Sequence, residues 1–586
     1  MSRQRLARSV GLFVLLTTIG RLLGFGREMA LAAVFGASDV SDAYTISFSI
    51  PGVLFVAFGT AITTVMVPML AAHRGRGDLD RFRRLAWTLF HTLLLLLLIL
   101  LAVAMLGSGW LVRIFAPGFT GEQFELARRL TLIMLPGIVF MGMEGWMEGV
   151  LNASKRFTAP AAASIPMNLV LIGATWFLGT RYGIEAVAWG SLAGFASQVL
   201  LQWGALRRAG VGYLPVLDLG DPELRVAGRR TLPVLLATAT RQASQVVNRA
   251  LASGLPAGSA AALSFAYRVY QLPLGLLAIP LVTVLYPEMA EQGSQQRLRA
   301  LSSTMNRALR LLTFVMAPIT VGTVLLREDI TALVYQRGAF DRMDTLMTAT
   351  ALCFYGLGMV PFAWRELLAR AMYSLGDTRT PATNGMMSMG LSIVLALVLV
   401  RFLDHGGIAL ATALATWWAA VVLILRLQRR YRDLRFRSLA VGVLQAAVAT
   451  AVMGGAIALL RVPVLAAAGR WLGAATHGAA GAPGAAGAAL AVVAPGASVA
   501  PGAVDIAALG FLPRLAGTLV LVAVGAAVYA LMLVLLRVEE RTYVLDLVRR
   551  RGRGSHPSRG ASGTGSGGQE VAPGAAAEAA RSDDRD

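Results

Sequence analysis

The chain has 586 residues, of which 56% are hydrophobic and only 15% charged, and its mean hydropathy is +0.64. Soluble domains carry about 25% charged residues, so this composition excludes an ordinary soluble protein. The single cysteine, Cys353, excludes an internal disulfide and a cysteine-rich metal site.

Apolar segments long enough to cross a membrane, about 20 residues each, recur along nearly the whole chain. The first follows three arginines like a signal peptide, but its helical pattern continues past Arg27 to Phe35, which predicts an uncleaved span. We therefore predict an all-α polytopic membrane protein with about fourteen transmembrane helices. In chain order these are residues 10–35, 42–70, 85–109, 124–151, 159–180, 184–206, 230–252, 257–286, 308–326, 342–372, 382–402, 406–428, 438–460 and 513–537.

Cations alternate between successive predicted loops. Arginines crowd the loop at 74–84 and every second loop after it, whereas the segments 36–41 and 253–258 contain none. Cytoplasmic loops of membrane proteins are enriched in Lys and Arg, so the pattern predicts that both termini are cytoplasmic. The net charge of +21 then reflects topology and the anionic inner leaflet, and it does not indicate a nucleic acid partner.

Three short motifs recur in order at an offset of roughly 220 residues, which is a repeat signal. The matched segments are 67–69 with 286–288, 114–119 with 334–340, and 158–161 with 380–382. The repeat predicts two six-helix bundles related by a pseudo-two-fold axis along the membrane normal, with a cavity between them.

The predicted organisation has four parts. They are an N-terminal bundle at 1–215, a C-terminal bundle at 220–436, helices 13 and 14 within 437–540, and a disordered cytoplasmic tail at 552–586. An Ala/Gly-rich linker at 461–512 would lie outside the cell, although 484–500 could form a weak span.

Charged side chains within the predicted spans identify the candidate site, because such charges are costly unless they face a wet cavity or a partner. Arginine is a planar bidentate donor suited to phosphate, and the excess of arginine predicts a cavity for a large anionic substrate such as a pyrophosphate. The alternative is internal salt bridging, for example between Arg27 and Asp42. The candidate substrate-binding residues are Arg21, Arg27, Glu28, Asp42, Arg241, Arg268 and Gln271.

Common catalytic signatures are missing from the sequence. It contains no nucleotide-binding P-loop, no HExxH and no nucleophile elbow. We therefore predict a non-enzymatic transporter without a cofactor, driven by a cation gradient or the membrane potential.

Several segments resemble a known family. Residues 21–28 read Arg-Leu-Leu-Gly-Phe-Gly-Arg-Glu, and they are followed by Val-Phe-Gly-Ala at 34–37 and Ser-Asp-Ala-Tyr at 41–44. With the further segments 266–273, 335–340 and 373–381, the chain resembles the MurJ/MviN family of lipid II flippases of bacterial cell-wall synthesis over about residues 5–540.

The resemblance implies the MOP-superfamily fold, fourteen spans and alternating access in the bacterial cytoplasmic membrane. It implies a monomer whose substrate is lipid II or a similar undecaprenyl-pyrophosphate-linked lipid, with a groove for the polyprenyl tail at helices 13 and 14. It carries the family's cavity arginines over to Arg21, Arg27 and Arg268, and their acidic partner to Asp42.

The chain departs from the family pattern in span 2. No cation follows Pro51 through Val56, where the family has an arginine, and no glutamate stands near Thr60. Arg241 is a hypothetical replacement for the missing charge.

Three other functions fit parts of the sequence. One is a flippase for a different polyprenyl-pyrophosphate-linked glycan, and another is a MATE-like cation-coupled exporter, for which a basic cavity is unsuited. The third is a membrane scaffold, which has no need of arginines within its spans.

Overall fold

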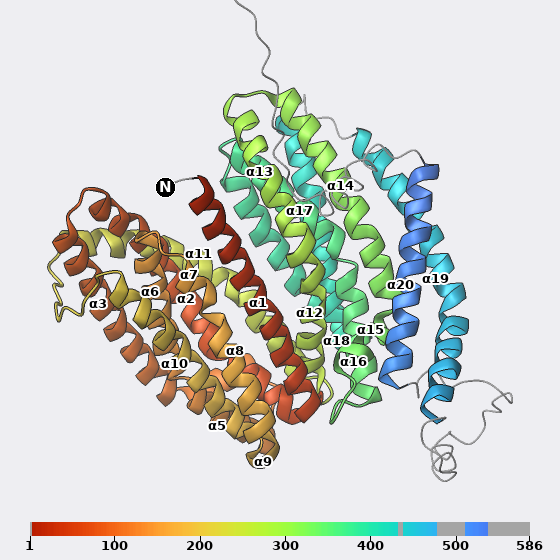
Figure 1. Ribbon diagram of the computed structural model, residues 1–586. Helices are drawn as coiled ribbons and strands as arrows, with labels where there is room; N and C mark the ends of the chain where they lie inside the picture. The colour runs from red at the N-terminus through yellow and green to blue at the C-terminus, as the bar shows by residue number, and fades with distance from the viewer. Residues whose placement is uncertain (1–2, 432–436, 478–509, 537–586) are drawn as a thin grey trace, which may run out of the picture. The chain divides into compact units, whose positions relative to one another are not determined.

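The computed structural model of the chain describes residues 3–431, 437–477 and 510–536, and every regular element in these ranges is a helix (Figure 1). The described residues belong to one compact unit. The predicted all-α fold is confirmed for this part of the chain.

The helices follow one another with short connections. The first set comprises α1 (Arg3–Phe35), α2 (Asp39–Gly75), α3 (Leu79–Leu106), α4 (Ser108–Phe115), α5 (Gly121–Met134), α6 (Gly137–Ala153), α7 (Thr158–Ala162), α8 (Ser164–Gly173), the π-helical turn η1 (Ala174–Gly179), α9 (Thr180–Tyr182) and α10 (Ile184–Arg208). The later helices are α11 (Pro222–Ser253), α12 (Ser259–Pro273), the π-helical turn η2 (Leu274–Ala278), α13 (Ile279–Ser294), α14 (Leu298–Leu325), α15 (Arg327–Tyr335), α16 (Arg342–Gly356), α17 (Met359–Ser374), α18 (Arg379–Arg430), α19 (Arg437–His477) and α20 (Phe511–Leu535).

Every predicted span coincides with one of these helices or with consecutive ones. By length and composition, nine helices or helical runs of the described residues could cross a membrane, or ten if α16 and α17, which are bent by 41°, form one span. The long α18 counts once among them, but Asp404 has a non-helical backbone (φ 47°, ψ −133°) and divides it where the sequence predicts two spans. The number fourteen stays a prediction.

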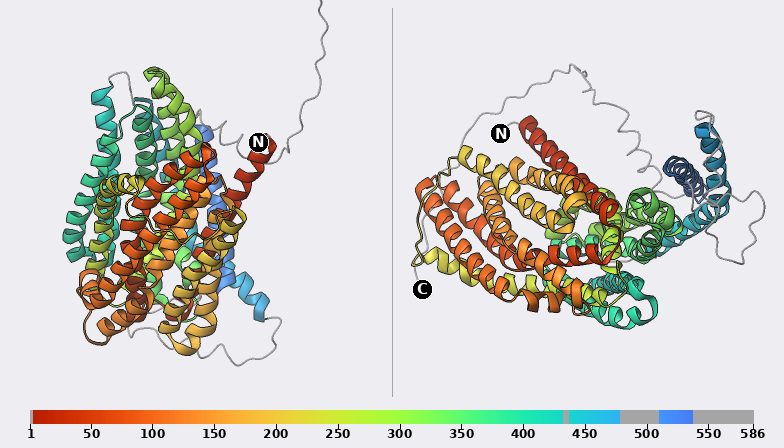
Figure 2. Two further views of the ribbon diagram at one scale, coloured as in Figure 1. Left: turned by 90° about the vertical axis from the view of Figure 1, so that its left-hand side faces the viewer. Right: turned by 90° about the horizontal axis from the view of Figure 1, so that it is seen from below.

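The helices pack in two sets. Helices α2–α10 contact mainly one another, as do α12–α18, and α1 lies along α7 and α8 (Figures 1 and 2). Helix α11 packs against α2 of the first set and α18 of the second, so it joins them. The predicted domain boundary near residue 220 therefore falls at a helix that both sets share, and the division itself stays a prediction.

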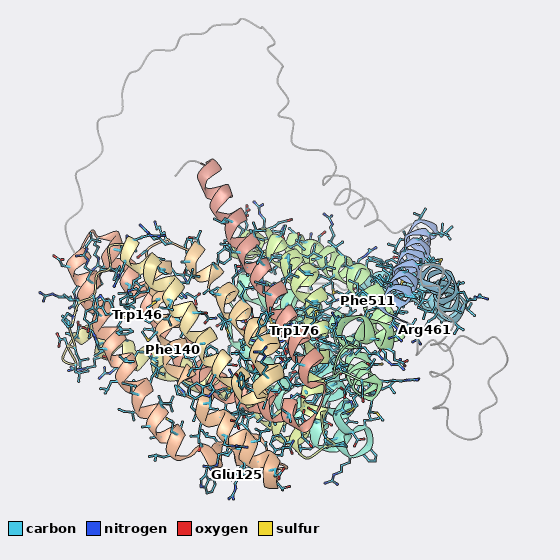
Figure 3. All side chains as sticks on the ribbon, turned by 60° about the horizontal axis from the view of Figure 1, so that its bottom comes forward. Glu125, Phe140, Trp146, Trp176, Arg461 and Phe511 are labelled. Carbon is cyan, nitrogen blue, oxygen red and sulfur yellow. The ribbon has the colours of Figure 1, made fainter. Side chains whose placement is uncertain are left out.

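Helices α19 and α20 pack against each other and against α14 at one edge of the second set (Figure 1). The predicted linker boundary at 461 is wrong, because α19 continues to His477. The segment is rich in Ala and Leu, which favour helix, and it has its own tertiary contacts. Leu465 is fully buried, and Arg461, labelled beside Phe511 in Figure 3, pairs with Asp329 of α15 (Nε–Oδ2 2.8 Å). Residues 478–509 of the predicted linker and the predicted tail lie outside the described residues.

We predict that the Arg461–Asp329 pair holds α19 to the second set. Asp329→Ala should lower the free energy of unfolding by about 1–3 kcal/mol, because it leaves a partly buried guanidinium without its closest carboxylate. Thermal denaturation of the purified protein in detergent measures the change. Arg470→Ala, at an exposed position on the same helix, is the matched control, and equal Tm values for the two variants would contradict the prediction.

Candidate functional site

Helix α1 presents predicted site residues to α12 and η2. Arg21 and Glu28 lie about two helical turns apart, so they share one side of the helix. Arg21 is exposed, and its Nη1 lies 3.4 Å from the carbonyl oxygen of Gly275 in η2. Glu28 is buried, and only 13% of the Arg27 side chain is accessible. Arg21, at the exposed end of this side, therefore carries a positive charge that makes only one long contact.

Glu28 is shared by two arginines from different helix sets. Its Oε1 lies 2.6 Å from Nη2 of Arg27 and 3.3 Å from Nε of Arg268 on α12. The Arg27 guanidinium also lies over the ring of Phe48 on α2, 5.0 Å from its centroid, a cation–π distance. One carboxylate facing two guanidiniums leaves this cluster with a net positive charge.

Three neighbouring cavities surround this cluster, with volumes of about 520, 200 and 260 Å³. The first and second share Arg27, Arg268 and Gln271, and Tyr267 lines all three. We call the three together the central chamber. Five of the predicted site residues line it: Arg21, Arg27, Glu28, Arg268 and Gln271.

The structure places Asp42 differently from the prediction. Its carboxylate accepts hydrogen bonds from the backbone N–H groups of Gly258 (2.8 Å) and Ala261 (2.6 Å), at the N-terminus of α12. It is 2% exposed and does not line the central chamber. The proposed Arg27–Asp42 salt bridge is wrong, because unpaired N–H groups at a helix start attract a carboxylate and Arg27 already has Glu28 beside it.

The Asp42 contact belongs to a seam that joins the two helix sets at one end of the central chamber. We define the seam as residues 33–42 with 253–261 and 336–344. In it the Ala339 N–H donates to the Ala33 carbonyl (2.8 Å), and the Ala37 N–H donates to Oδ2 of Asp344 (2.9 Å).

Glycine permits the close approach of backbones at the seam. Gly258 has φ +82°, and a Cβ there would lie 2.0 Å from the Ala37 carbonyl oxygen. Gly338 has φ +62°, and its Cβ would lie 2.1 Å from the Ala33 carbonyl oxygen. Larger residues would hold the two sets apart, so the seam depends on direct contacts between the backbones of the two sets.

Arg241, the predicted site residue of span 7, has a side chain outside the described residues. The same helix, α11, contributes Arg249, which is not among the predicted site residues, to two of the cavities. A charged residue inside an apolar span is the feature of the sequence that could have identified it. Arg249 lies close to the end of its helix, however, where charged residues are common. With Arg249 counted, the described residues that line the central chamber include four arginines and one acid, Glu28. The chamber is therefore strongly cationic and suits an anionic ligand.

Comparison with known proteins identifies relatives over most of the chain. A family model described as "Lipid II flippase MurJ" matches residues 31–469. The probable lipid II flippase MurJ of Rhizobium tropici is 31% identical over 76% of this chain and 85% of its own length. The lipid II flippase MurJ of Burkholderia cenocepacia is 29% identical over 71% of this chain and 82% of its own length.

Solved structures with the same fold include a lipid II flippase MurJ in an inward closed conformation. It aligns with a TM-score of 0.71 and 22% identity over 92% of this chain and 100% of its own. An inward-facing MATE multidrug resistance transporter of the MOP superfamily aligns with a TM-score of 0.61 and 14% identity over 72% of this chain and 98% of its own. These likenesses show that the predicted superfamily fold is correct.

We predict that Gly258→Val keeps the seam open, because its Cβ would meet the Ala37 carbonyl. Spin labels at Glu122 and Arg342, two exposed positions at the same end of the molecule on different helix sets, report the opening as a longer distance in the purified protein. The labelled background replaces Cys353 with serine.

The matched control is Gly183→Val. Gly183 also has a positive φ (+75°), but a Cβ there meets nothing within 4 Å, so the variant introduces backbone strain without a clash. A Gly258→Val protein with the distance distribution of the control would show that the seam tolerates the side chain and is no gate.

Proposed function

Because this chain belongs to the lipid II flippase MurJ family, we propose that it flips lipid II by taking the diphosphate of the head group into the central chamber. The relatives are named as flippases of this lipid, and the chain covers more than four-fifths of their length in the two cases described. Flipping moves an intact lipid between leaflets, so we propose a transport cycle with no covalent step.

One observation carries the proposal. Arg21 of α1 and Arg268 of α12 line the same cavity of about 520 Å³, although they are far apart in the chain. Arg268 shares its carboxylate partner with Arg27, and Arg21 has only a long contact to a carbonyl. Both guanidiniums therefore keep donors for a phosphate, which they can bind from two sides by charge-assisted hydrogen bonds.

The closed seam supports alternating access. With that end sealed, the head group can enter the central chamber only from elsewhere, and release across the seam requires Asp42 to part from α12. Water can replace these hydrogen bonds when the seam opens, so the net cost of parting is about 0.5–1.5 kcal/mol for each bond. Substrate binding, a cation gradient or the membrane potential can supply this free energy.

The remaining features of the proposal concern topology and assembly. We propose that the arginine-rich loops face the cytoplasm, so that the seam lies at the outer face of the bacterial cytoplasmic membrane. We also propose that the transporter is a monomer. Helices α19 and α20, packed beside α14, offer an apolar surface for the polyprenyl tail.

We predict that Arg21→Ala and Arg268→Ala each weaken lipid II binding about tenfold to a hundredfold, because each loses a charge-assisted contact of roughly 1.5–3 kcal/mol. Both proteins should still insert and accumulate, since Glu28 keeps Arg27 as a partner and Arg21 has only a long contact. Lysine should rescue each variant only in part, because it lacks the bidentate fork. Binding to the purified protein and complementation of a flippase-depleted strain are the measurements.

The matched control for this pair is Arg128→Ala, which removes a partly exposed arginine paired with Glu125 away from the chamber. It should bind lipid II like the unmodified protein. Alanine variants of Arg21 and Arg268 that are abundant and flip normally would exclude the diphosphate clamp.

We predict the orientation from the loop charges. In intact cells whose protein lacks Cys353, an impermeant thiol reagent should label a cysteine at exposed Glu122 and should not label one at exposed Asp80 until the membrane is made permeable. Labelling of position 80 from outside would reverse the proposed topology.

A further inference from the structure

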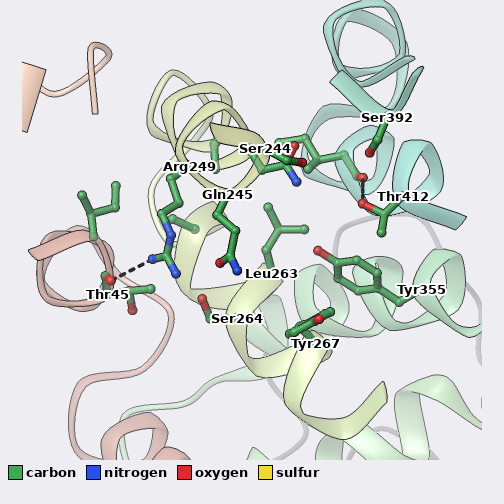
Figure 4. A pocket seen from close by; sticks show the side chains of 15 residues that line it. Thr45, Ser244, Gln245, Arg249, Leu263, Ser264, Tyr267, Tyr355, Ser392 and Thr412 are labelled. Atoms are coloured by element: carbon green, nitrogen blue, oxygen red, sulfur yellow. Dashed lines mark hydrogen bonds between the residues drawn. The ribbon is translucent and has the colours of Figure 1, made fainter. Parts of the chain in front are cut away.

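Arg249 reaches the central chamber from α11 and has no role in the diphosphate clamp. Its Nη1 donates a 3.1 Å hydrogen bond to the carbonyl oxygen of Thr45 on α2, and Figure 4 shows the guanidinium directed toward that residue. Among the described residues no acidic side chain forms an ion pair with Arg249. The one acid lining the chamber, Glu28, is taken up by Arg27 and Arg268.

The bond to Thr45 leaves most of the guanidinium available. An arginine has five N–H donors, and a single backbone acceptor uses one of them. A charge held within an apolar helix bundle is costly without a counter-charge, and such charges mark substrate pathways by default. A brace between α11 and α2 would need only the bond to Thr45, but Arg249 also lines the cavities of about 200 and 260 Å³.

The residues around Arg249 suit a ligand in which a hydrophilic, uncharged portion lies next to an anionic group. The cavity of about 260 Å³ has five aliphatic residues in its lining and seven hydroxyl or amide side chains, namely Thr45, Ser244, Gln245, Asn248, Ser264, Ser392 and Thr412 (Figure 4). Tyr267 and Tyr355 close one side, with ring centroids 5.5 Å apart. Hydroxyls, amides and aromatic faces around one charged group form a site that fixes orientation and specificity.

This second site adjoins the diphosphate clamp at Arg268, which lines the cavities of about 520 and 200 Å³, but it does not include Arg21. Arg21 lines only the cavity of about 520 Å³, and Arg249 lines only the other two. The cavities of about 520 and 200 Å³ share Arg27, Arg268 and Gln271 in their linings. A head group with its diphosphate at Arg21 and Arg268 would therefore extend its more distant portion toward Arg249.

We infer that Arg249 binds a carboxylate of the head group and so makes the transporter selective for a polyprenyl-diphosphate lipid that carries a peptide. The inference rests on the proposed function. Lipid II carries a peptide with free carboxylates beyond its diphosphate, whereas a lipid-linked glycan of neutral sugars does not. Arg249 then distinguishes peptide-bearing lipids from lipids with neutral glycans, which the diphosphate clamp alone would bind equally well.

The test compares three ligands on the full-length protein in nanodiscs: lipid II, lipid II with its peptide carboxylates amidated, and undecaprenyl diphosphate. Arg249→Gln should weaken binding of lipid II about tenfold or more, the size of one lost charge-assisted contact. It should leave binding of the amidated lipid and of undecaprenyl diphosphate within about twofold. Arg268→Ala should weaken binding of all three ligands, because it acts on the diphosphate.

Arg113→Gln is the matched control, since it removes an exposed arginine remote from the chamber. If Arg249→Gln binds lipid II like this control, or loses all three ligands equally, the carboxylate subsite is overturned while the proposed function stands. If the unmodified protein binds none of the ligands, the proposed function itself fails.

If the Arg249→Gln variant does not accumulate, a comparison of ligands on the unmodified protein still tests the inference. If Arg249 binds a peptide carboxylate, amidation of the peptide should weaken binding of lipid II to the unmodified protein by about tenfold. Equal affinity for the free and the amidated lipid overturns the inference without any mutation.

Discussion

The carboxylate of Glu28 lies between two guanidiniums, one on its own helix and one on α12. Charges within a membrane need a partner or a wet cavity, and here one acid serves two arginines across the boundary between two helix sets. It lowers the cost of holding Arg27 and Arg268 together without cancelling their charge. The positive charge that remains in the chamber is what an anionic head group can neutralise. Without Glu28 the two cations would repel each other, and a second acid would leave little attraction for a diphosphate.

The seam at the other end of the chamber uses a different kind of contact. Asp42 caps α12, and backbone groups of the two sets meet directly where Gly258 and Gly338 allow it. Water can satisfy such groups once they separate, which makes the contact reversible in a way that a dry apolar interface is not. The molecule therefore combines a cationic centre with a seam whose polar groups water can satisfy if they part.

Helices α19 and α20 are connected to the seam through polar contacts. Arg461 pairs with Asp329 on α15, and Arg514 of α20 donates to Gln336 just beyond the end of α15 (2.6 Å). The segment that follows Gln336 contains Ala339, whose N–H reaches Ala33 of α1 in the seam. A lipid tail lying on α19 and α20 would thus sit on helices joined to the seam by a short series of contacts.

The sequence by itself determined the helical class and singled out Arg21, Arg27 and Arg268, which the structure brings to one chamber. A segment that crosses a lipid bilayer is a long apolar helix. A charged residue within such a segment, such as Arg21, Arg27 or Arg268, is therefore easy to recognise in the sequence. Only the tertiary structure decided the partners: Glu28 rather than Asp42 beside Arg27, Asp42 at the start of α12, and Arg249 inside the chamber. These contacts depend on how each helix is rotated and on which distant helix lies beside it, and a pattern of charges along one chain does not contain that information.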